Sequence, residues 1–195
     1  GIAIGNYGIT MNSRNDQRLT LNGLAIGTTS HGIFMLTQAN QDVVITGEVR
    51  GHRAIETKGR DQTLSLTGNA YGGIICTGDN QTVEITGDLY GQDQNIPALY
   101  ADGSEVQLIA INGTTYGGPN GDGIQILAGT STTVHSGTNY GQNGLEITSH
   151  SGDTINMITS DGHNIGQEIG AKIYGVSYVE LYGTNEGQTN GVNLD

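Results

Sequence analysis

Apolar and polar residues alternate along this chain in short runs that each end at a glycine. Residues 19–23 read Leu-Thr-Leu-Asn-Gly, and residues 83–87 read Val-Glu-Ile-Thr-Gly. Alternation with a period of two is typical of a β-strand whose two faces meet different environments. Asn and Asp accept left-handed backbone, so the Asn-Gln or Asp-Gln pair before each run predicts a sharp bend. These pairs stand at residues 16–17, 40–41, 61–62 and 80–81.

A glycine box, Gly-x-x-x-Gly, ends these runs and recurs along the whole chain. Successive first glycines are separated by 19 to 26 residues. The nine boxes begin at Gly1, Gly23, Gly47, Gly68, Gly87, Gly113, Gly137, Gly162 and Gly183. A period in the twenties is typical of a solenoid, in which each turn buries its apolar face only against its neighbours. The sequence therefore predicts a single β-solenoid domain over residues 1–195.

Each turn is expected to hold three short strands. Arg50 and Glu186 occupy the fourth box position, where burial would be costly, so this position should face outward and the third inward. A Gly-Ile or Gly-Leu segment after the box, as at residues 32–33 and 144–145, supplies the third strand. Uneven turns favour a right-handed coil. We predict an all-β, right-handed parallel β-helix of about eight coils, roughly 38 Å long at a strand spacing of about 4.8 Å.

Composition fits narrow, tightly bent coils and limits the classes of function. The chain has 33 Gly, 2 Pro and no Trp, and its formal net charge is −12. Lys172 is the one basic residue after position 60. This acidic surface argues against nucleic-acid binding, and the lack of an 18-residue apolar run argues against membrane insertion. The single cysteine, Cys76, is interpreted as a small buried side chain rather than a nucleophile.

The two ends of the sequence carry no polar capping segment of the kind that solenoids need for solubility. We expect the chain to be a segment of a longer protein, or a subunit whose ends are covered by neighbours. Open strand edges also predict end-to-end self-association.

Two long corner loops, at residues 92–97 and 118–122, are the expected place for a functional site. They belong to consecutive coils, so they should lie side by side and carry Asp93 and Asp122. Carboxylates stacked on one edge can bind calcium or protonate a sugar oxygen, whereas solvated acids in ordinary loops would do neither. No standard calcium-loop motif occurs, so no metal site is predicted, although calcium stays an open alternative.

Four tyrosines occupy the fourth box position in consecutive coils and predict an outward ladder: Tyr71, Tyr90, Tyr116 and Tyr140. Such a row could bind a ligand by stacking on sugar faces, or its rings could stack on one another. At the third box position, Asn139, Asn164 and Asn185 predict an inward row of hydrogen-bonded amides.

Other polar groups form no clear site. The cluster Arg50, Arg53, Lys58 and Arg60 within one coil could hold a uronate or sulfate, or form a solvated face. The five histidines share no position in the repeat and are expected at the surface or in turns. They are His31, His52, His135, His150 and His163.

Residues 83–91, which read Val-Glu-Ile-Thr-Gly-Asp-Leu-Tyr-Gly, resemble the β-helix repeats of large secreted bacterial proteins. These are autotransporter passengers, filamentous haemagglutinin-like adhesins and type I-secreted repeat proteins. The resemblance implies a structural or adhesive rod, located outside the cell or on a bacterial cell surface. Its expected partner is a polysaccharide or another cell-surface ligand.

The pectate lyase-like enzymes share this fold and supply the alternative function. Residues 120–124, Asn-Gly-Asp-Gly-Ile, are similar to a catalytic strand of polygalacturonases. The second Asp-Asp pair and the Arg-x-Lys triplet of those enzymes are absent. The alternative is a polysaccharide lyase, hydrolase or epimerase that uses Asp93 and Asp122. Ice binding, a third class, needs a flat face of repeated Thr, which the middle of the strand before the box does not supply.

Overall fold

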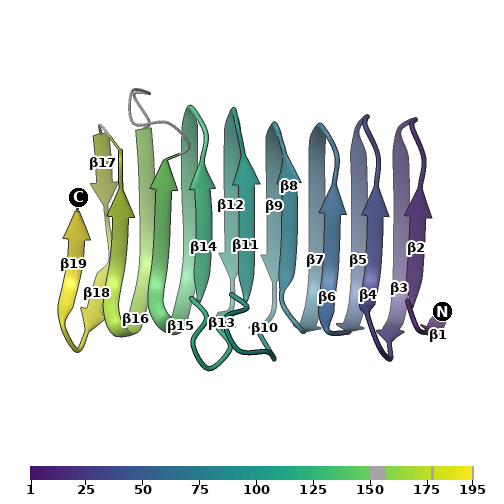
Figure 1. Cartoon of the computed structure of the whole chain (residues 1–195), viewed down its shortest axis with the longest axis horizontal. Coiled ribbons are helices and arrows are strands. Elements are labelled where there is room, and N and C mark those ends of the chain that lie inside the picture. The colour runs from purple at the N-terminus through teal and green to yellow at the C-terminus, as the bar shows by residue number, and fades with distance from the viewer. Residues whose placement is uncertain (150–156, 177, 195) are drawn as a thin grey trace.

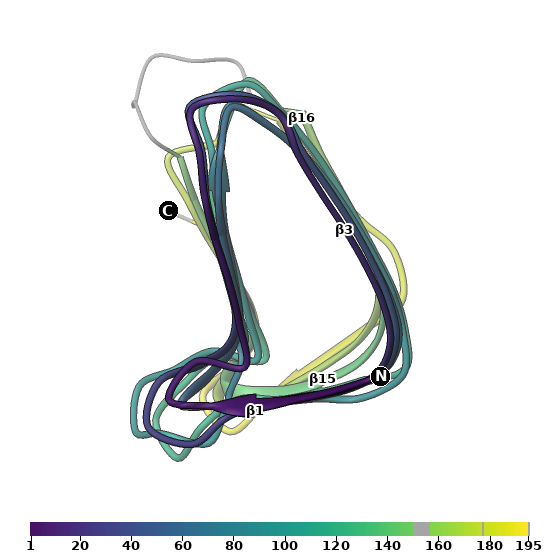
Figure 2. The same ribbon diagram turned by 90° about the vertical axis from the view of Figure 1, so that its right-hand side faces the viewer.

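The computed structural model describes residues 1–149, 157–176 and 178–194, and it shows a parallel β-solenoid of about eight turns. Nineteen strands pair in parallel into one continuous sheet, and the described residues contain no helix. In that part of the chain, therefore, no helix could cross a membrane. Seen from the N-terminal end, the chain turns clockwise as it recedes, so the coil is right-handed, as predicted (Figures 1 and 2).

The coils have a triangular cross-section with three faces (Figure 2). Strands confined to the first face are β1 (Ile2–Gly5), β10 (Leu89–Tyr90), β13 (Thr114–Tyr116) and β18 (Thr184–Gly187). Those confined to the second face are β2 (Ile9–Asn12), β4 (His31–Leu36), β6 (Arg53–Lys58), β8 (Ile74–Gly78), β11 (Leu99–Gly103), β14 (Ile124–Ala128) and β19 (Asn190–Leu194). The third face alone holds β9 (Asn80–Thr86), β12 (Val106–Asn112) and β17 (Tyr178–Leu181).

Five longer strands bend around corners. Strands β3 (Gln17–Gly27), β5 (Gln41–Arg50) and β7 (Asp61–Tyr71) run from the third face onto the first. Strands β15 (Ser131–Ser149) and β16 (Met157–Tyr174) pass over all three faces.

The first glycine of each box lies where the third face turns into the first. Gly47 has a φ of 136°, and a Cβ built there would lie 1.9 Å from the carbonyl oxygen of Gly23. Gly68 stands in the same relation to Gly47, at 1.8 Å. A side chain at this corner would therefore collide with the backbone of the coil below, which explains why glycine recurs there.

The register aligns the boxes of neighbouring coils, so that Gly23 pairs with Gly47 and Gly47 with Gly68. The third box position faces inward, as predicted: Val49 and Leu89 are fully buried. The fourth faces outward, and Arg50 and Glu186 are exposed. Apolar side chains from all three faces fill one continuous interior.

Two polar columns are buried beside this apolar core. The predicted amide row is present: Asn139 Nδ2 donates to Asn164 Oδ1 at 2.6 Å, and Asn164 Nδ2 donates to Asn185 Oδ1 at 2.7 Å. Thr115 Oγ1 donates to Asn139 Oδ1 at 2.9 Å and extends the row by one coil.

The second column consists of glutamines at the corner between the second and third faces. Gln107 Nε2, for example, donates to the carbonyl oxygens of Gly103 and Leu127 at 3.2 and 2.8 Å. The column comprises Gln17, Gln41, Gln62, Gln81 and Gln107, all buried. The side-chain amides donate hydrogen bonds to backbone carbonyl oxygens at the end of the second face. The Gln of each predicted bend therefore lies in the interior and not in solvent.

Candidate functional site

The two long loops lie side by side at the corner between the first and second faces, as predicted. Gly118 N donates to Ile96 O at 2.9 Å, and Ala98 N donates to Asp122 O at 3.1 Å. These loops extend beyond the outline of most other coils at this corner (Figures 1 and 2).

Asp122, at the end of the second loop, is buried rather than solvated, with 8% of its surface exposed. Its Oδ1 accepts hydrogen bonds from both N and Nδ2 of Asn143, each at 2.9 Å. Burial is the main reason why the pKa of Asp122 rises to about 6, and the negative charge of Glu146 adds to it. The Asn143 hydrogen bonds and the charge of Lys172 act in the opposite direction.

Glu146 and Lys172 stand beside Asp122 because of the strand register. Gln125 of β14, Glu146 of β15 and Lys172 of β16 are consecutive partners in one outward row of the second face. Lys172 Nζ lies 3.1 Å from Glu146 Oε2, and Asn143 Nδ2 donates to the same oxygen at 2.9 Å. One amide group therefore bridges the carboxylates of Asp122 and Glu146.

These side chains line a cavity of about 320 Å³, hereafter the Asp122 pocket. Its walls come from four successive corners and the outward row of the second face. The lining residues are Asn95, Pro97, Asn120, Gly121, Asp122, Gln125, Gln142, Asn143, Glu146, Glu168 and Lys172. Asn143 is 4% exposed, and its Oδ1 is buried without a hydrogen-bond partner. An unpaired buried acceptor is costly unless a bound group donates to it.

Asp93 does not join this pocket. Its Oδ2 lies 2.6 Å from Nδ1 of His52, two coils nearer the N-terminus, and Asp93 is not among the residues that line the pocket. The two loops are neighbours, but their carboxylates contact different groups. The predicted pair of Asp93 and Asp122 is thus replaced by Asp122 and Glu146, joined through Asn143.

The tyrosine ladder is present on the first face, as Tyr71, Tyr90, Tyr116 and Tyr140. Successive ring centroids lie 4.9, 5.0 and 5.3 Å apart, and the ring planes are within 6° of parallel. The guanidinium of Arg50 covers the outer ring of Tyr71 at 4.9 Å. Because the rings contact one another face to face, the inner faces are not available for stacking on a sugar.

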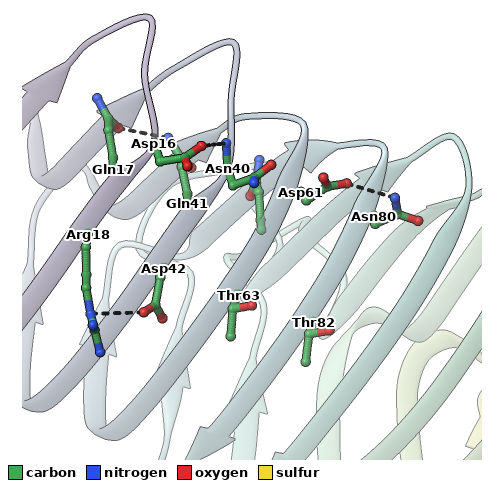
Figure 3. A pocket seen from close by; sticks show the side chains of 11 residues that line it. Asp16, Gln17, Arg18, Asn40, Gln41, Asp42, Asp61, Thr63, Asn80 and Thr82 are labelled. Atoms are coloured by element: carbon green, nitrogen blue, oxygen red, sulfur yellow. Dashed lines mark hydrogen bonds and ion pairs between the residues drawn. The ribbon is translucent and has the colours of Figure 1, made fainter.

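A second hollow, of about 490 Å³, runs along the corner between the second and third faces. Figure 3 shows its two bordering rows, one from Asp16 to Asn80 and the other from Arg18 to Thr82. Its carboxylates bond to neighbouring coils: Asp16 Oδ1 accepts from Asn40 N, and Asp61 Oδ1 accepts from Asn80 Nδ2. We therefore assign this hollow a structural role.

The histidines that the structure describes are each paired with a carboxylate, and Cys76 is buried. Four histidines lie beside carboxylates, as in His31 with Glu56 at 2.8 Å and His135 with Asp161 at 3.2 Å, whereas His150 lies outside the described residues. Burial raises the pKa of the Cys76 thiol to about 11, against a smaller opposing effect of Thr57, so this thiol is not an activated nucleophile.

The three arginines of the basic cluster are likewise held in separate pairs. Arg50 contacts Glu48, Arg53 contacts Glu56, and Arg60 contacts Asp61. Across residues 1–149, 157–176 and 178–194, no group of three or more His, Cys, Asp or Glu side chains is placed to hold a metal ion.

The fold and the pocket together define a class: a right-handed parallel β-solenoid with a polar, carboxylate-lined pocket at one corner. The chain matches no protein-family model, no curated protein and no solved structure. The resemblance to secreted adhesins and to pectate lyase-like enzymes stays a sequence-based prediction.

Proposed function

We propose that this chain is an adhesive, structural rod of an extracellular or cell-surface protein, and that it binds carbohydrate in the Asp122 pocket. The observation that carries the proposal is the pocket itself, where amides and carboxylates converge beside two long loops. Its volume of about 320 Å³ is at the small end of the range of about 300–1,000 Å³ for ligand pockets. That size suits one sugar unit of a longer polymer.

The donor and acceptor groups of the pocket match the chemistry of a sugar. Gln125 and Gln142 line the pocket and donate through Nε2 to Glu146 Oε1 and Glu168 Oε1, at 3.4 and 3.1 Å, and Asn143 contributes an unpaired acceptor. Sugar hydroxyls both donate and accept, so they can donate to Asn143 Oδ1 and also bond to the amides and carboxylates around it. The tyrosine ladder is a weaker candidate for the same task, because its rings are used in contacts with one another.

The test is binding of the purified chain to a panel of immobilised polysaccharides. We expect retention on at least one glycan, and we expect the double variant Gln125→Ala/Gln142→Ala to weaken it about thirtyfold, since each of the two amide hydrogen bonds contributes about 1 kcal/mol. The control, Gln38→Ala, changes an exposed amide outside the pocket and should bind like wild type. Absence of binding to every glycan would remove the proposal.

A second candidate, a polysaccharide lyase, hydrolase or epimerase, is favoured by one observation. The pKa of about 6 allows Asp122 to hold a proton near neutral pH, mainly because the group is buried, and Glu146 supplies a second carboxylate nearby. The same glycans, incubated with the chain, should then release reducing or unsaturated ends. That release should be lost in Asp122→Asn while binding is kept.

A further inference from the structure

The charges around the Asp122 pocket are unequal. Three carboxylates line it, those of Asp122, Glu146 and Glu168, against the single ammonium group of Lys172. Lys172 is already paired with Glu146 at 3.1 Å. A ligand that enters the pocket therefore meets an excess of negative charge, and an anionic sugar would have to approach Glu168 and Glu146 without a free basic group to receive it.

The unpaired atom in the pocket is also an acceptor. Both hydrogens of Asn143 Nδ2 are directed to carboxylates, at Asp122 Oδ1 and Glu146 Oε2. This fixes the orientation of the amide, and Oδ1 is left buried without a partner. The group that completes the pocket must therefore donate a hydrogen bond, which an ammonium group or a sugar hydroxyl can do.

The surrounding field has the same sign. Residues 61–195 contain fifteen acidic residues and no basic residue other than Lys172. Such a field attracts cationic ligands and repels anionic ones before contact is made. The local and the distant charges thus both favour a cationic ligand, and the orphan acceptor requires that this ligand also donate a hydrogen bond.

We propose that the sugar bound in the Asp122 pocket is an amino sugar with a free ammonium group, as in a polymer of glucosamine, and not a uronate or a sulfated sugar. An ammonium group offers three donors and one positive charge to Asn143 Oδ1, Glu146 and Glu168. This inference rests on the proposed carbohydrate function and narrows it. It differs from the uronate or sulfate ligand that the basic cluster in the sequence suggested.

The experiment is isothermal titration calorimetry of the full chain with three hexasaccharides: glucosamine, N-acetylglucosamine and galacturonate. It is run at about 0.15 M salt, where the distant charges are largely screened. We expect the glucosamine hexamer to bind about tenfold or more tightly than the N-acetylated hexamer, which lacks the charge, and the galacturonate hexamer not to bind.

Two variants at the pocket should shift the affinity in opposite directions. Glu146→Gln removes an acceptor charge and leaves Lys172 unpaired, so glucosamine binding should fall about tenfold. Lys172→Met removes the competing ammonium, so binding should become about threefold tighter. Glu84→Gln, an equal charge change at an exposed site on the third face, is the matched control and should stay within about twofold.

Glu168→Gln, in an exposed corner, replaces Glu146→Gln if circular dichroism shows that the latter does not fold. Tighter binding of galacturonate than of glucosamine would overturn the inference and leave the proposed function standing. Equal losses in the pocket variant and in Glu84→Gln would also overturn it, because the attraction would then be a property of the whole surface. If none of the three hexasaccharides binds, and the polysaccharide panel also fails, the proposed function falls with it.

Discussion

At the residue scale, this chain is specified by groups that can occupy only one place in a coil. No other residue type fits at Gly47 or Gly68, because a Cβ there would collide with a backbone carbonyl oxygen of the coil below. Gln81 and Gln107 pair backbone carbonyls that would otherwise be buried without a donor. Asp122 differs from these, because its burial raises its pKa and so has an energetic cost at neutral pH.

This cost makes stability depend on pH. The native state holds the Asp122 proton up to about pH 6, whereas the unfolded chain releases it near its ordinary pKa of 3.8. Between these values the native state binds more protons than the unfolded state, so the free energy of unfolding falls as the pH rises from about 4 to about 6. A shift of this size corresponds to about 3 kcal/mol.

We therefore predict that Asp122→Asn is more stable than wild type at pH 7.5, by about 2–3 kcal/mol, and no more stable at pH 4. Urea denaturation followed by circular dichroism at both pH values measures this. Asp42→Asn, at an exposed carboxylate 3.1 Å from Arg18, is the control and should show no such gain. A difference between Asp122→Asn and wild type that is the same at both pH values would contradict the role of burial.

At the element scale, each coil is a unit whose strands find their partners only in the coils on either side. Thr46 pairs with Thr67, and Gly47 pairs with Gly68. Residues 47–67 therefore form one complete turn, and their removal would bring Gly68 to the place of Gly47, above Gly23. The glycine column, the glutamine column and the inward row would all keep their spacing.

We predict that deletion of residues 47–67 gives a folded rod that is shorter by one coil, because stability in such arrays comes from contacts between neighbours. The far-UV circular dichroism spectrum should remain that of β-structure, and thermal unfolding should remain cooperative. A matched deletion of residues 47–57 removes about half a turn, breaks the register and should not fold. A random-chain spectrum for the whole-coil deletion would count against the prediction.

The sequence was sufficient to predict these elements, and the reason is physical. The collision at the glycine corner recurs in every turn, so it leaves a visible period, as at Gly23 and Gly47. The inward burial of Gln41 was missed, because a glutamine beside an Asn looks like part of a solvated bend. The signal that could have revealed it is its fixed place in the first four bends, where the preceding residue is either Asn or Asp but Gln does not change.

The candidate site was predicted only in part. The long loops and Asp122 could be found from loop length, but Asn143 and Glu146 lie one coil beyond Asp122 in the sequence, and Lys172 lies two coils beyond it. Their contact depends on the register of β14, β15 and β16, which follows only when the three strands are aligned turn by turn. The pairing of Asp93 with His52, across two coils, has no counterpart in the local sequence.

At the scale of the whole molecule, the chain is a rod whose described end strands each have a neighbour on one side only. Strand β1 pairs with β3, and β19 pairs with β16. Apolar side chains are exposed at both places: Ile2 and Ile4 at one end, Val192 and Leu194 at the other. Open parallel edges with apolar side chains are templates for pairing with another chain.

We predict that the isolated 195-residue chain associates end to end as its concentration rises. Sedimentation velocity over a hundredfold range of concentration should show dimers and longer species. Val192→Lys should reduce this association, because a charge on an edge strand opposes pairing, whereas Val44→Lys, on the third face away from the ends, should not. Monomers at every concentration would contradict the prediction.

The tyrosine ladder also allows the middle of the rod to be followed by near-ultraviolet circular dichroism and by fluorescence. Four phenol rings lie 4.9 to 5.3 Å apart in a protein without tryptophan. Chromophores this close share their excited states, so they should give an asymmetric near-ultraviolet signal and quench one another's emission. Loss of that coupling would report separation of the coils at Tyr71 to Tyr140 without any label. The near-ultraviolet signal of the tyrosine ladder should therefore report whether these coils stay stacked along the axis of the rod.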